Sequence, residues 1–471
     1  MTREDEARLV ADVDVAVVGA GPGGLATAVT AARAGLSVAL IDVLNRIGGN
    51  AAVSTGYLAF VGSAHQREAG IDDSVEDFLA DLQRQVERER ERTAVDYDGE
   101  IARIYAERSA DAFEFLSGLG VRFERFILRP HQHTNTRMLA LKQPEDFRTC
   151  FARELERLGV ALLLKSRVER LLMEDGRVVG LELEHEGASI TDLERQEVRA
   201  SKAVVLAAGG YQANHDLRRR FQSEDDSRGP YYGVSSARGD GHLMGQTVGG
   251  ALVNMTLIPM YVRCSSSLVE DVIAVNGYGM RFHDEAGPYI ERVKALRAQP
   301  ESIGYYIFDA RVAASKSGLV GHLPEAPRKA DTIARLAVLI GCEHEDLSET
   351  VATWNALVAS GAERDPEFGR VVFPSPRLGI IEPPFHVAPM IVGASFTAGG
   401  FQVTRRMQVR DEAGTPIPGL YAVGDCVGEV NPGAGVGGIH IASATTLGLV
   451  AGESVAEEEA VASGSIASDE A

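Results

Sequence analysis

Three glycines near the start of the chain have the spacing of a dinucleotide-binding turn. Segment 13–24 reads VDVAVVGAGPGG, an apolar run followed by Gly19-x-Gly21-x-x-Gly24. In such a turn the first glycine allows a tight bend, the second lets a pyrophosphate approach the backbone, and the third lets helix and strand pack closely. The next apolar run, SVALID, ends in Asp42, whose carboxylate can accept a hydrogen bond from a ribose hydroxyl. This order of residue types predicts a dinucleotide site.

Positively charged side chains gather in one short segment of an otherwise acidic chain. Segment 121–137 contains Arg125, Arg129, His131, His133 and Arg137, whereas the whole chain has a formal net charge of −20. The segment is either a wall of a substrate pocket that pairs with a carboxylate or carbonyl, or a surface loop with solvated arginines. The two histidines have no third metal ligand nearby, so we expect no metal site.

The glycine turn and its acid need a strand, a helix and a second strand to hold them. The apolar run before Gly19 is typical of a buried parallel strand, and LATAVTAARAGL after the turn is typical of a helix. Alternation predicts a strand over 160–172 and a hairpin turn at EDGR, and AVVLAAGG at 203–210 predicts a second buried strand. Near the C-terminus, GLYAVGD and an apolar helix repeat this pattern. The elements predict an α/β fold whose C-terminal segment rejoins the first domain.

Length, charge and cysteine spacing limit the class of protein. A chain of 471 residues is too long for one ordinary core, so we expect two domains. The net charge of −20 argues against nucleic acid and against an anionic membrane surface as partners. The four cysteines form no CxxC pair, the N-terminal segment lacks the apolar core of a signal peptide, and no apolar run reaches the ~20 residues of a membrane span. We therefore expect a cytoplasmic protein with free thiols and no membrane span.

Taken together, the motifs resemble those of the fumarate reductase and succinate dehydrogenase flavoproteins. The motifs that carry the resemblance are GxGxxG at 19–24, GGN at 48–50, AAGGY at 207–211, GDG at 239–241, RFHDE at 281–285, TAGGFQV at 397–403 and GLYAVGD at 419–425. The resemblance implies a Rossmann-like FAD-binding domain with an inserted α+β capping domain that closes over the flavin. We predict the first part of the FAD-binding domain at 1–263, the capping domain at 264–390, the second part at 391–455 and an acidic disordered tail at 456–471.

The resemblance also implies which residues hold FAD. They are Gly19, Gly21 and Gly24 at the pyrophosphate, Asp42 at the adenosine ribose, Val168 near the adenine, Gly49, Asn50, Ser54 and Gly56 along the ribityl chain and ring, Gly209, Asp240 and Asp425 at the ribityl or nearby atoms, and Ile439 and Ile441 beside the flavin. Succinate dehydrogenases attach FAD through a histidine in the loop after the second strand. The matching loop, GGNAAVSTG at 48–56, has none, so we expect FAD to bind non-covalently.

The residues that bind fumarate in this family are replaced in this sequence. Tyr289 stands where the proton-donating arginine would follow RFHDE, and Phe396 and Tyr261 stand where the family has histidines. A further arginine, in the C-terminal glycine loop, corresponds to Gly435. Recognition of a buried dicarboxylate needs its charged partners, so we do not expect fumarate or succinate as the substrate.

The segment RFHDEAGPYIERV resembles that of 3-ketosteroid Δ1-dehydrogenases, in which a tyrosine at this place is the catalytic base. The resemblance implies that Tyr289 removes the α-proton of a cyclic ketone and that the β-hydrogen leaves as a hydride to flavin N5. Gly438 corresponds to the glycine whose N–H binds the ketone oxygen, whereas the tyrosine that assists it corresponds to Ala434 or Asn431. The expected substrate is a steroid or a smaller ring ketone, with or without a carboxylate.

A tyrosine base needs an activating neighbour, because a phenol has a pKa of about 10. The candidate neighbours are Tyr261, His131, His133 and Arg137. His440, in the glycine loop, either faces the flavin or begins a helix. Two alternatives to ketone desaturation stay open. One is reduction of the C=C bond of a non-fumarate substrate. The other is a protein that binds FAD without catalysis, and the presence of Tyr289 as a base argues against it. The electron acceptor is oxygen, a quinone or a redox protein.

Overall fold

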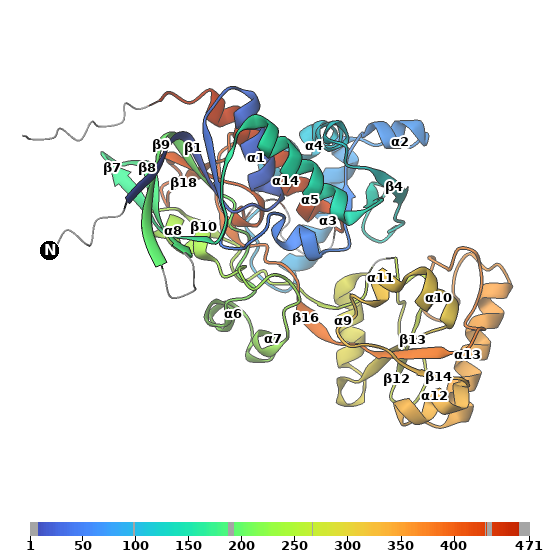
Figure 1. The fold of residues 1–471 in the computed structure, drawn as a ribbon. Helices are drawn as coiled ribbons and strands as arrows, with labels where there is room; N and C mark the ends of the chain where they lie inside the picture. Colours follow the sequence, from blue (N-terminus) through green and yellow to red (C-terminus); the bar gives the residue numbers. More distant parts are fainter. Residues whose placement is uncertain are drawn as a thin grey trace, which may run out of the picture.

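An eight-stranded sheet forms the centre of the larger of two lobes (Figure 1). The structure is a computed structural model that describes residues 8–97, 99–186, 193–265, 267–428, 430 and 436–460. The main path of the sheet is β18 (Gln408–Arg410), β19 (Pro416–Ala422), β9 (Leu193–Leu206), β1 (Arg8–Val18), β2 (Val38–Ile41) and β6 (Ala161–Leu163). All neighbours on this path are parallel except β18 and β19, and the apolar runs of β1 and β2 are buried. The α/β fold expected from the sequence is confirmed.

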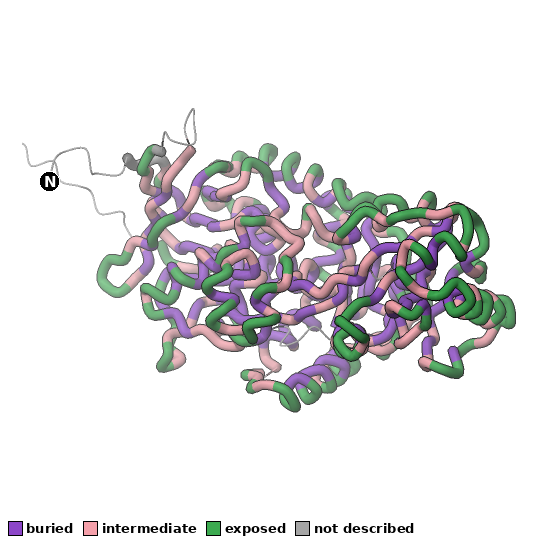
Figure 2. The backbone as a smooth tube through the Cα atoms, turned by 90° about the horizontal axis from the view of Figure 1, so that it is seen from below, coloured by how far each residue is buried: buried purple, intermediate pink, exposed green. Residues whose placement is uncertain are grey.

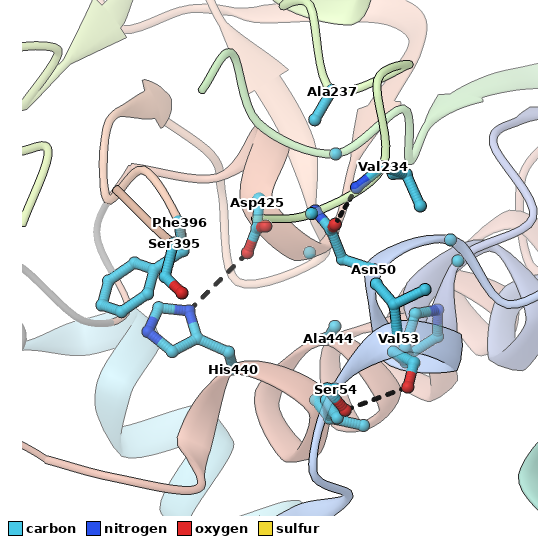
Figure 3. Close-up of a pocket in the computed structure, with 18 of the residues that line it drawn as sticks. Asn50, Val53, Ser54, Val234, Ala237, Ser395, Phe396, Asp425, His440 and Ala444 are labelled. Atoms are coloured by element: carbon cyan, nitrogen blue, oxygen red, sulfur yellow. Dashed lines mark hydrogen bonds and ion pairs between the residues drawn. The ribbon is translucent and has the colours of Figure 1, made fainter. Parts of the chain in front are cut away.

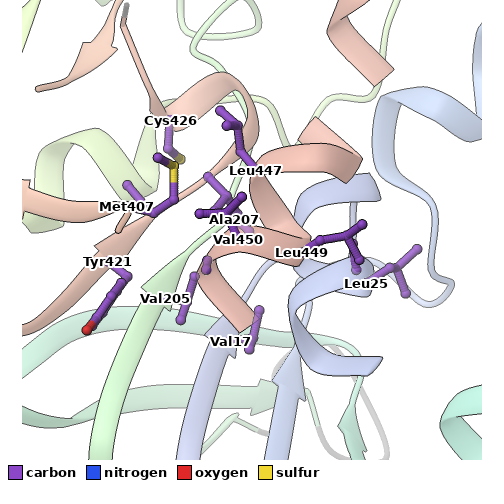
Figure 4. Packing of buried hydrophobic residues seen from close by; sticks show 14 of the residues in the cluster. Val17, Leu25, Val205, Ala207, Met407, Tyr421, Cys426, Leu447, Leu449 and Val450 are labelled. Carbon is purple, nitrogen blue, oxygen red and sulfur yellow. The ribbon is translucent and has the colours of Figure 1, made fainter. Parts of the chain in front are cut away.

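The first and last helices of the chain pack together beside this sheet. Helix α1 (Pro22–Arg33) contacts α14 (Ile439–Ala456) so closely that the Thr27 hydroxyl donates a hydrogen bond to Gly448 O, 3.1 Å away. Figure 4 shows Leu25 and Leu449 from the two helices in one apolar cluster with strand residues. By length and composition α14 could cross a membrane, but 78% of its 18-residue window is buried inside the lobe, as in the core helix of a soluble protein.

The strand expected over 160–172 is two strands. β6 pairs with β2 in the central sheet, whereas β7 (Ser166–Glu174) pairs with β8 (Arg177–Glu186), which continues onto β9. The chain changes direction at Lys165, which has a φ of 54°. Lys165, Ser166 and Arg167 interrupt the apolar run at this break, but apolar residues resume at Val168, so the pattern predicts one strand. The change of direction carries Val168 off the main path of the sheet, onto the β7–β8 hairpin.

The smaller lobe has its own antiparallel sheet with a core on each face. Its order is β12 (Ile273–Asn276), β13 (Gly304–Phe308), β15 (Phe385–Pro389) and β14 (Arg328–Ala330). Side chains alternate along β12: Ile273 packs with Trp354 on one face, and Ala274 packs with Val293 on the other. The helices of this lobe are α9 (Tyr289–Arg297), α10 (Ala310–Ser315), α11 (Ser317–Val320), α12 (Ile333–Ile340) and α13 (His344–Ala359). Figure 2 shows buried segments inside both lobes and exposed segments around them.

Two short strands join the lobes. The chain leaves the larger lobe after β11 (Met260–Val262) and returns through β16 (Val392–Ala394), and these strands pair antiparallel with Tyr261 opposite Gly393. The domain boundaries expected at 263/264 and 390/391 lie beside this ladder and stay a prediction. Helix α14 ends at Ala456, and residues 461–471 of the expected acidic tail lie outside the described residues.

The remaining elements surround the central sheet and the connection between the lobes. A three-stranded sheet consists of β3 (Tyr57–Ala59), β5 (Met138–Leu141) and β4 (Phe123–Phe126), and β10 (Leu252–Val253) pairs with β17 (Gly400–Phe401). The other helices are α2 (Ala64–Glu68), α3 (Val75–Arg90), α4 (Glu100–Leu119), α5 (Pro144–Leu158), α6 (His215–Phe221), α7 (Glu224–Arg228) and α8 (Asp240–Thr247). Single 3-10 turns lie at η1 (Gly49–Val53), η2 (Pro300–Ser302) and η3 (Gly424–Cys426).

A buried ion-pair cluster makes the smaller lobe sensitive to acid. The Glu285 carboxylate is fully buried and accepts hydrogen bonds from Arg370 (2.7 Å) and Arg281 (2.9 Å). Burial raises the pKa of Glu285, but the two arginines outweigh burial and lower the pKa to about 2. A carboxyl whose pKa is lower folded than unfolded stabilises the protein above its unfolded pKa, and this stabilisation is lost as the pH falls toward the folded pKa.

We therefore expect Glu285→Gln to be less stable than the wild type at pH 7, by a margin that narrows as the pH falls from about 5 to 3. The free energy of unfolding in urea at each pH measures this margin. A margin that stays constant over this range would contradict the assignment of the cluster as charged.

Candidate active site

A cavity lies between the two lobes, and residues from both of them line it. Its wall includes the glycine turn before α1, the 49–57 loop, residues 207–209, the start of α14, and Tyr289 at the start of α9. Figure 3 shows Asn50, Ser54, Phe396, Asp425 and His440 around this cavity. The described part of the chain has no group of three histidine, cysteine or acidic side chains that could hold a metal ion.

The glycine turn has the geometry that a pyrophosphate site requires. Gly19 has a φ of 107°, and a Cβ there would lie 2.2 Å from Ala207 O; a Cβ on Gly24 would lie 1.9 Å from Gly19 O. These two glycines therefore allow close packing. A Cβ on Gly21, by contrast, would meet no atom within 4 Å, and Gly21 lines the cavity. Gly21 caps α1 without a side-chain hydrogen bond, which leaves helix N–H groups available to an anion.

Asp42 directly follows β2 and lines the cavity, and its carboxylate also holds the local backbone. Oδ2 accepts a hydrogen bond from Ala20 N (2.7 Å), and Oδ1 accepts one from Leu44 N (2.8 Å). Burial raises the pKa of Asp42, against the opposing effect of these hydrogen bonds. The same residue also lines an adjoining smaller cavity with Val168 and Asp240. The residue predicted near the adenine thus lies beside the one predicted at the ribose, and this placement of the adenosine end stays a prediction.

The structure distributes the other expected cofactor contacts over these two cavities. The larger cavity is lined by Gly49, Asn50, Ser54, Gly209, Asp425, Gly438 and Ile441. Asp240 is instead in the smaller cavity, where it forms an ion pair with Arg167, so the structure separates Asp240 from Asp425. Gly56 packs against Leu141, and Ile439 is fully buried in the core, so neither lines a cavity.

A second helix N-terminus is open to the larger cavity. Gly438 caps α14 with a φ of 79° and no side-chain hydrogen bond. Two side chains of segment 121–137 contact the backbone of Gly437, the residue before this cap. Gly437 N donates a hydrogen bond to Gln132 Oε1 (3.0 Å), and His133 Nε2 lies 2.9 Å from Gly437 O. The N-termini of α1 and α14 thus both present positive dipole ends to the cavity.

Aromatic side chains form the wall opposite the glycine turn. The rings of Tyr289 and Tyr261 are 5.4 Å apart, those of Tyr261 and Phe396 are 5.8 Å apart, and those of Phe396 and His440 are 3.6 Å apart. The three positions that depart from the fumarate pattern therefore meet at one place. The fourth, Gly435, and the positions Ala434 and Asn431 lie outside the described residues. His440 belongs to the first turn of α14 and also lines the cavity, 3.7 Å from Asp425.

Three of the four expected neighbours of Tyr289 do not line this cavity. Arg137 is buried between Asp73 and Asp81, with its Nη2 2.7 Å from Asp73 Oδ1. His133 is buried, and burial together with the Arg137 charge lowers its pKa to about 4, so His133 is neutral at pH 7. His131 lies 3.5 Å from Asp284 on the smaller lobe. Tyr261 is the expected neighbour that contacts Tyr289, and burial raises its pKa and keeps its hydroxyl protonated.

The placement of Arg137 predicts a role in stability. Removal of one partner from a buried ion pair leaves an uncompensated charge, which typically costs 3–5 kcal/mol. We expect Arg137→Met to lower the free energy of unfolding by about 3 kcal/mol, because Asp73 and Asp81 lose their shared cation. Denaturant titration measures this loss. A variant as stable as the wild type with reduced turnover would instead indicate a direct catalytic role.

Two buried arginines interact with Tyr289, and the sequence reasoning named neither as its neighbour. The Arg292 guanidinium carbon lies 4.7 Å from the Tyr289 ring centroid, and Arg292 is 2% exposed. Arg129 is 5% exposed; burial lowers its pKa, and the Tyr289 hydroxyl is the largest opposing influence. The spacing of Tyr289 and Arg292, three residues apart on one helix, was the available signal. Arg129 was named as part of the positive segment but not as a neighbour of the tyrosine.

The fit of the two cavities to a dinucleotide agrees with comparisons to known proteins. Residues 14–441 match the FAD binding domain family. Urocanate reductase of Eggerthella lenta is 30% identical over 95% of this chain and 75% of its own length. The 4-oxocyclohexanecarboxylate 2-dehydrogenase of Sinomonas cyclohexanicum is 27% identical over 95% of this chain and 93% of its own length.

A solved flavocytochrome c3 fumarate reductase, described in its open conformation, superimposes with a TM-score of 0.76. The two sequences are 27% identical, and the match covers 95% of this chain and 78% of that chain. The expected FAD-binding fold is therefore confirmed. The chain belongs to the FAD-binding flavoproteins of the fumarate reductase and succinate dehydrogenase superfamily, and it is an FAD-dependent oxidoreductase that acts on CH–CH bonds.

Proposed function

We propose that this enzyme introduces a C=C bond next to the carbonyl of a cyclic ketone, with Tyr289 as the base. The observation that carries the proposal is the position of Tyr289. It lies on the cavity wall with its ring 5.4 Å from Tyr261 and the Arg292 guanidinium 4.7 Å from its ring centroid. A base must reach the substrate carbon from the wall of the site, and Tyr289 lies on that wall.

The residues of the cavity divide the reaction between them. The ketone oxygen accepts a hydrogen bond from backbone N–H at the start of α14, near Gly438, which stabilises negative charge as it develops on that oxygen. Tyr289 acts as a phenolate, takes the α-proton onto its oxygen and becomes the neutral phenol. The β-carbon–hydrogen bond breaks with its electron pair leaving as hydride, and the C=C bond forms between the two carbons. When bound, FAD supplies the two-electron acceptor for this hydride.

The aromatic wall suits a flat apolar ring. Tyr57, Tyr232, Tyr261, Tyr289 and Phe396 all line the cavity. Aromatic walls with a few polar groups are typical of small-molecule sites. The name of the Sinomonas relative describes desaturation of a ring ketone that bears a carboxylate, which supports the same class of substrate for this enzyme. A 3-ketosteroid is the larger member of that class.

A second candidate is reduction of a C=C bond in a substrate other than fumarate. The 30% identity to a urocanate reductase favours it. The two reactions use the same wall of the cavity in opposite directions, so the direction of electron flow distinguishes them.

Anaerobic mixing tests the proposal. Oxidised holoenzyme is mixed with cyclohexanone, 4-oxocyclohexanecarboxylate and a 3-ketosteroid, and the flavin absorption band is followed. We expect at least one ketone to bleach the band and to yield the conjugated enone. If no ketone bleaches the band, and a conjugated enone or enoate restores it in dithionite-reduced enzyme, the reductase is correct and the desaturase is not.

A further inference from the structure

We propose that Arg263 binds a carboxylate of the substrate and thereby selects ring ketones that carry an acid group. The inference rests on the proposed function for the rest of the substrate, and it assigns this binding role to a residue that the sequence did not single out. From the sequence, segment 121–137 was the candidate source of a cation that pairs with a substrate carboxylate or carbonyl. His133 and Arg137 of that segment are held by other partners and do not line the cavity.

Arg263 lies two residues after Tyr261 in extended chain and lines the same cavity. Tyr261 is the middle residue of β11, and Arg263 follows this strand directly. Tyr261 and Arg263 both line the cavity. Val262 and Cys264 border it as well, but their side chains belong to the apolar core of the smaller lobe, so Arg263 supplies the charge in this part of the wall. Arg263 therefore lines the same cavity as Tyr261 and Tyr289.

Neutral groups hold the guanidinium of Arg263 in place. Nε donates to His322 O (2.8 Å), Nη1 donates to Tyr232 O (3.1 Å), and the guanidinium carbon lies 4.6 Å from the Tyr232 ring centroid. Among the described residues, no carboxylate lies within ion-pair distance of Arg263 and Nη2 has no acceptor. A fixed arginine that lines a cavity and lacks a charged partner is suited to a planar anion, because its N–H groups match the two oxygens of a carboxylate.

Arg263 differs from Arg129 in lacking an acidic partner among the described residues. Arg129, which does not line the cavity, lies 3.8 Å from Glu270, so an acidic group already accompanies that cation. Burial lowers the pKa of Arg263, and the tyrosines around it oppose this effect only in part. An arginine nevertheless keeps its charge at neutral pH. A carboxylate on the substrate would supply the missing counter-charge.

Arg263 also links the lobes, because His322 belongs to the smaller lobe and Tyr232 to the larger one. A purely structural bridge would affect every ligand of the cavity equally, whereas a carboxylate site would affect only charged ligands. The experiment therefore compares cyclohexanecarboxylate with cyclohexanecarboxamide, a neutral ligand of nearly the same shape. Neither ligand is a ketone, so the binding result does not depend on whether the desaturase is correct.

The ligands are titrated into oxidised holoenzyme of the wild type, Arg263→Gln and Arg263→Lys, and Kd is read from the perturbation of the flavin absorption spectrum. We expect Arg263→Gln to raise the Kd of the carboxylate by about 10- to 100-fold and to leave the Kd of the amide within about 2-fold. Arg263→Lys keeps the charge and should retain part of the preference for the carboxylate. FAD content and Tm confirm that each variant is folded.

Arg377→Gln is the matched control. Arg377 also stacks on an aromatic ring, 4.4 Å from the Phe373 centroid, and donates to a backbone carbonyl, but it does not line the cavity. We expect both Kd values to be unchanged in this variant. The proposal is overturned if Arg263→Gln leaves the Kd of the carboxylate unchanged, if it weakens the two ligands equally, or if the wild type does not prefer the carboxylate. Retained preference for the acid without bleaching by any ketone would overturn the desaturase alone.

Discussion

Replacement of Tyr289 by phenylalanine is expected to lower the turnover of a ring ketone on the order of 10³-fold while FAD stays bound. The phenol oxygen is the group that takes the α-proton in the proposed reaction, and phenylalanine keeps the ring that packs on Tyr261 and Arg292. The cavity should therefore keep its shape and lose its base. Anaerobic stopped-flow reduction by the ketone measures the rate of the chemical step directly.

A second measurement separates loss of the base from loss of packing. In deuterated water the wild type should exchange the α-hydrogen of a bound ketone, and Tyr289→Phe should not. Tyr278→Phe is the control, because Tyr278 is 56% exposed on the smaller lobe and does not line the cavity. Turnover of Tyr289→Phe within a few-fold of the wild type would show that another group removes the proton.

Replacement of Gly21 by valine is expected to abolish FAD binding without unfolding the protein. A Cβ on Gly21 meets no atom within 4 Å and enters the cavity beside the N-terminus of α1, where the pyrophosphate would lie. The added side chain thus occupies the space of the ligand rather than that of the core. The purified variant should lack the flavin absorption band and keep the far-ultraviolet circular dichroism of the wild type. Its Tm should match that of wild-type apoprotein, because loss of a bound ligand also removes its stabilisation.

Two other glycines provide the comparison. Gly24→Val places its Cβ 1.9 Å from Gly19 O, so this variant should lose stability as well as FAD. Gly118→Val, in α4, has open space around its Cβ and should bind FAD normally. A Gly21→Val protein that is purified with a full complement of FAD would refute the placement of the pyrophosphate.

The cofactor site is the part of the molecule that sequence reasoning described best. Gly19, Gly21 and Gly24 lie within six residues of one another, and their roles follow from the local path of the backbone. Asp42 directly follows the next strand, so its place on the cavity wall also follows from neighbouring elements. The strand break at Lys165 was missed because the apolar residues continue on both sides of it, and a single φ of 54° is not visible in periodicity.

From the sequence alone, the resemblance to fumarate reductases implied that Tyr289, Phe396 and Tyr261 stand where that family has an arginine and two histidines. Only the tertiary structure decided which charges accompany them. Arg137 lies between Asp81 of α3 and Asp73 of the segment before it, and Arg292 stacks on Tyr289. Arg263 lines the cavity with no acidic partner among the described residues. A motif specifies neighbours along the chain. The electrostatic interaction energy of a charged side chain depends instead on its burial and on its distances to groups that are far away in sequence. Those distances are set by the packing of the two lobes.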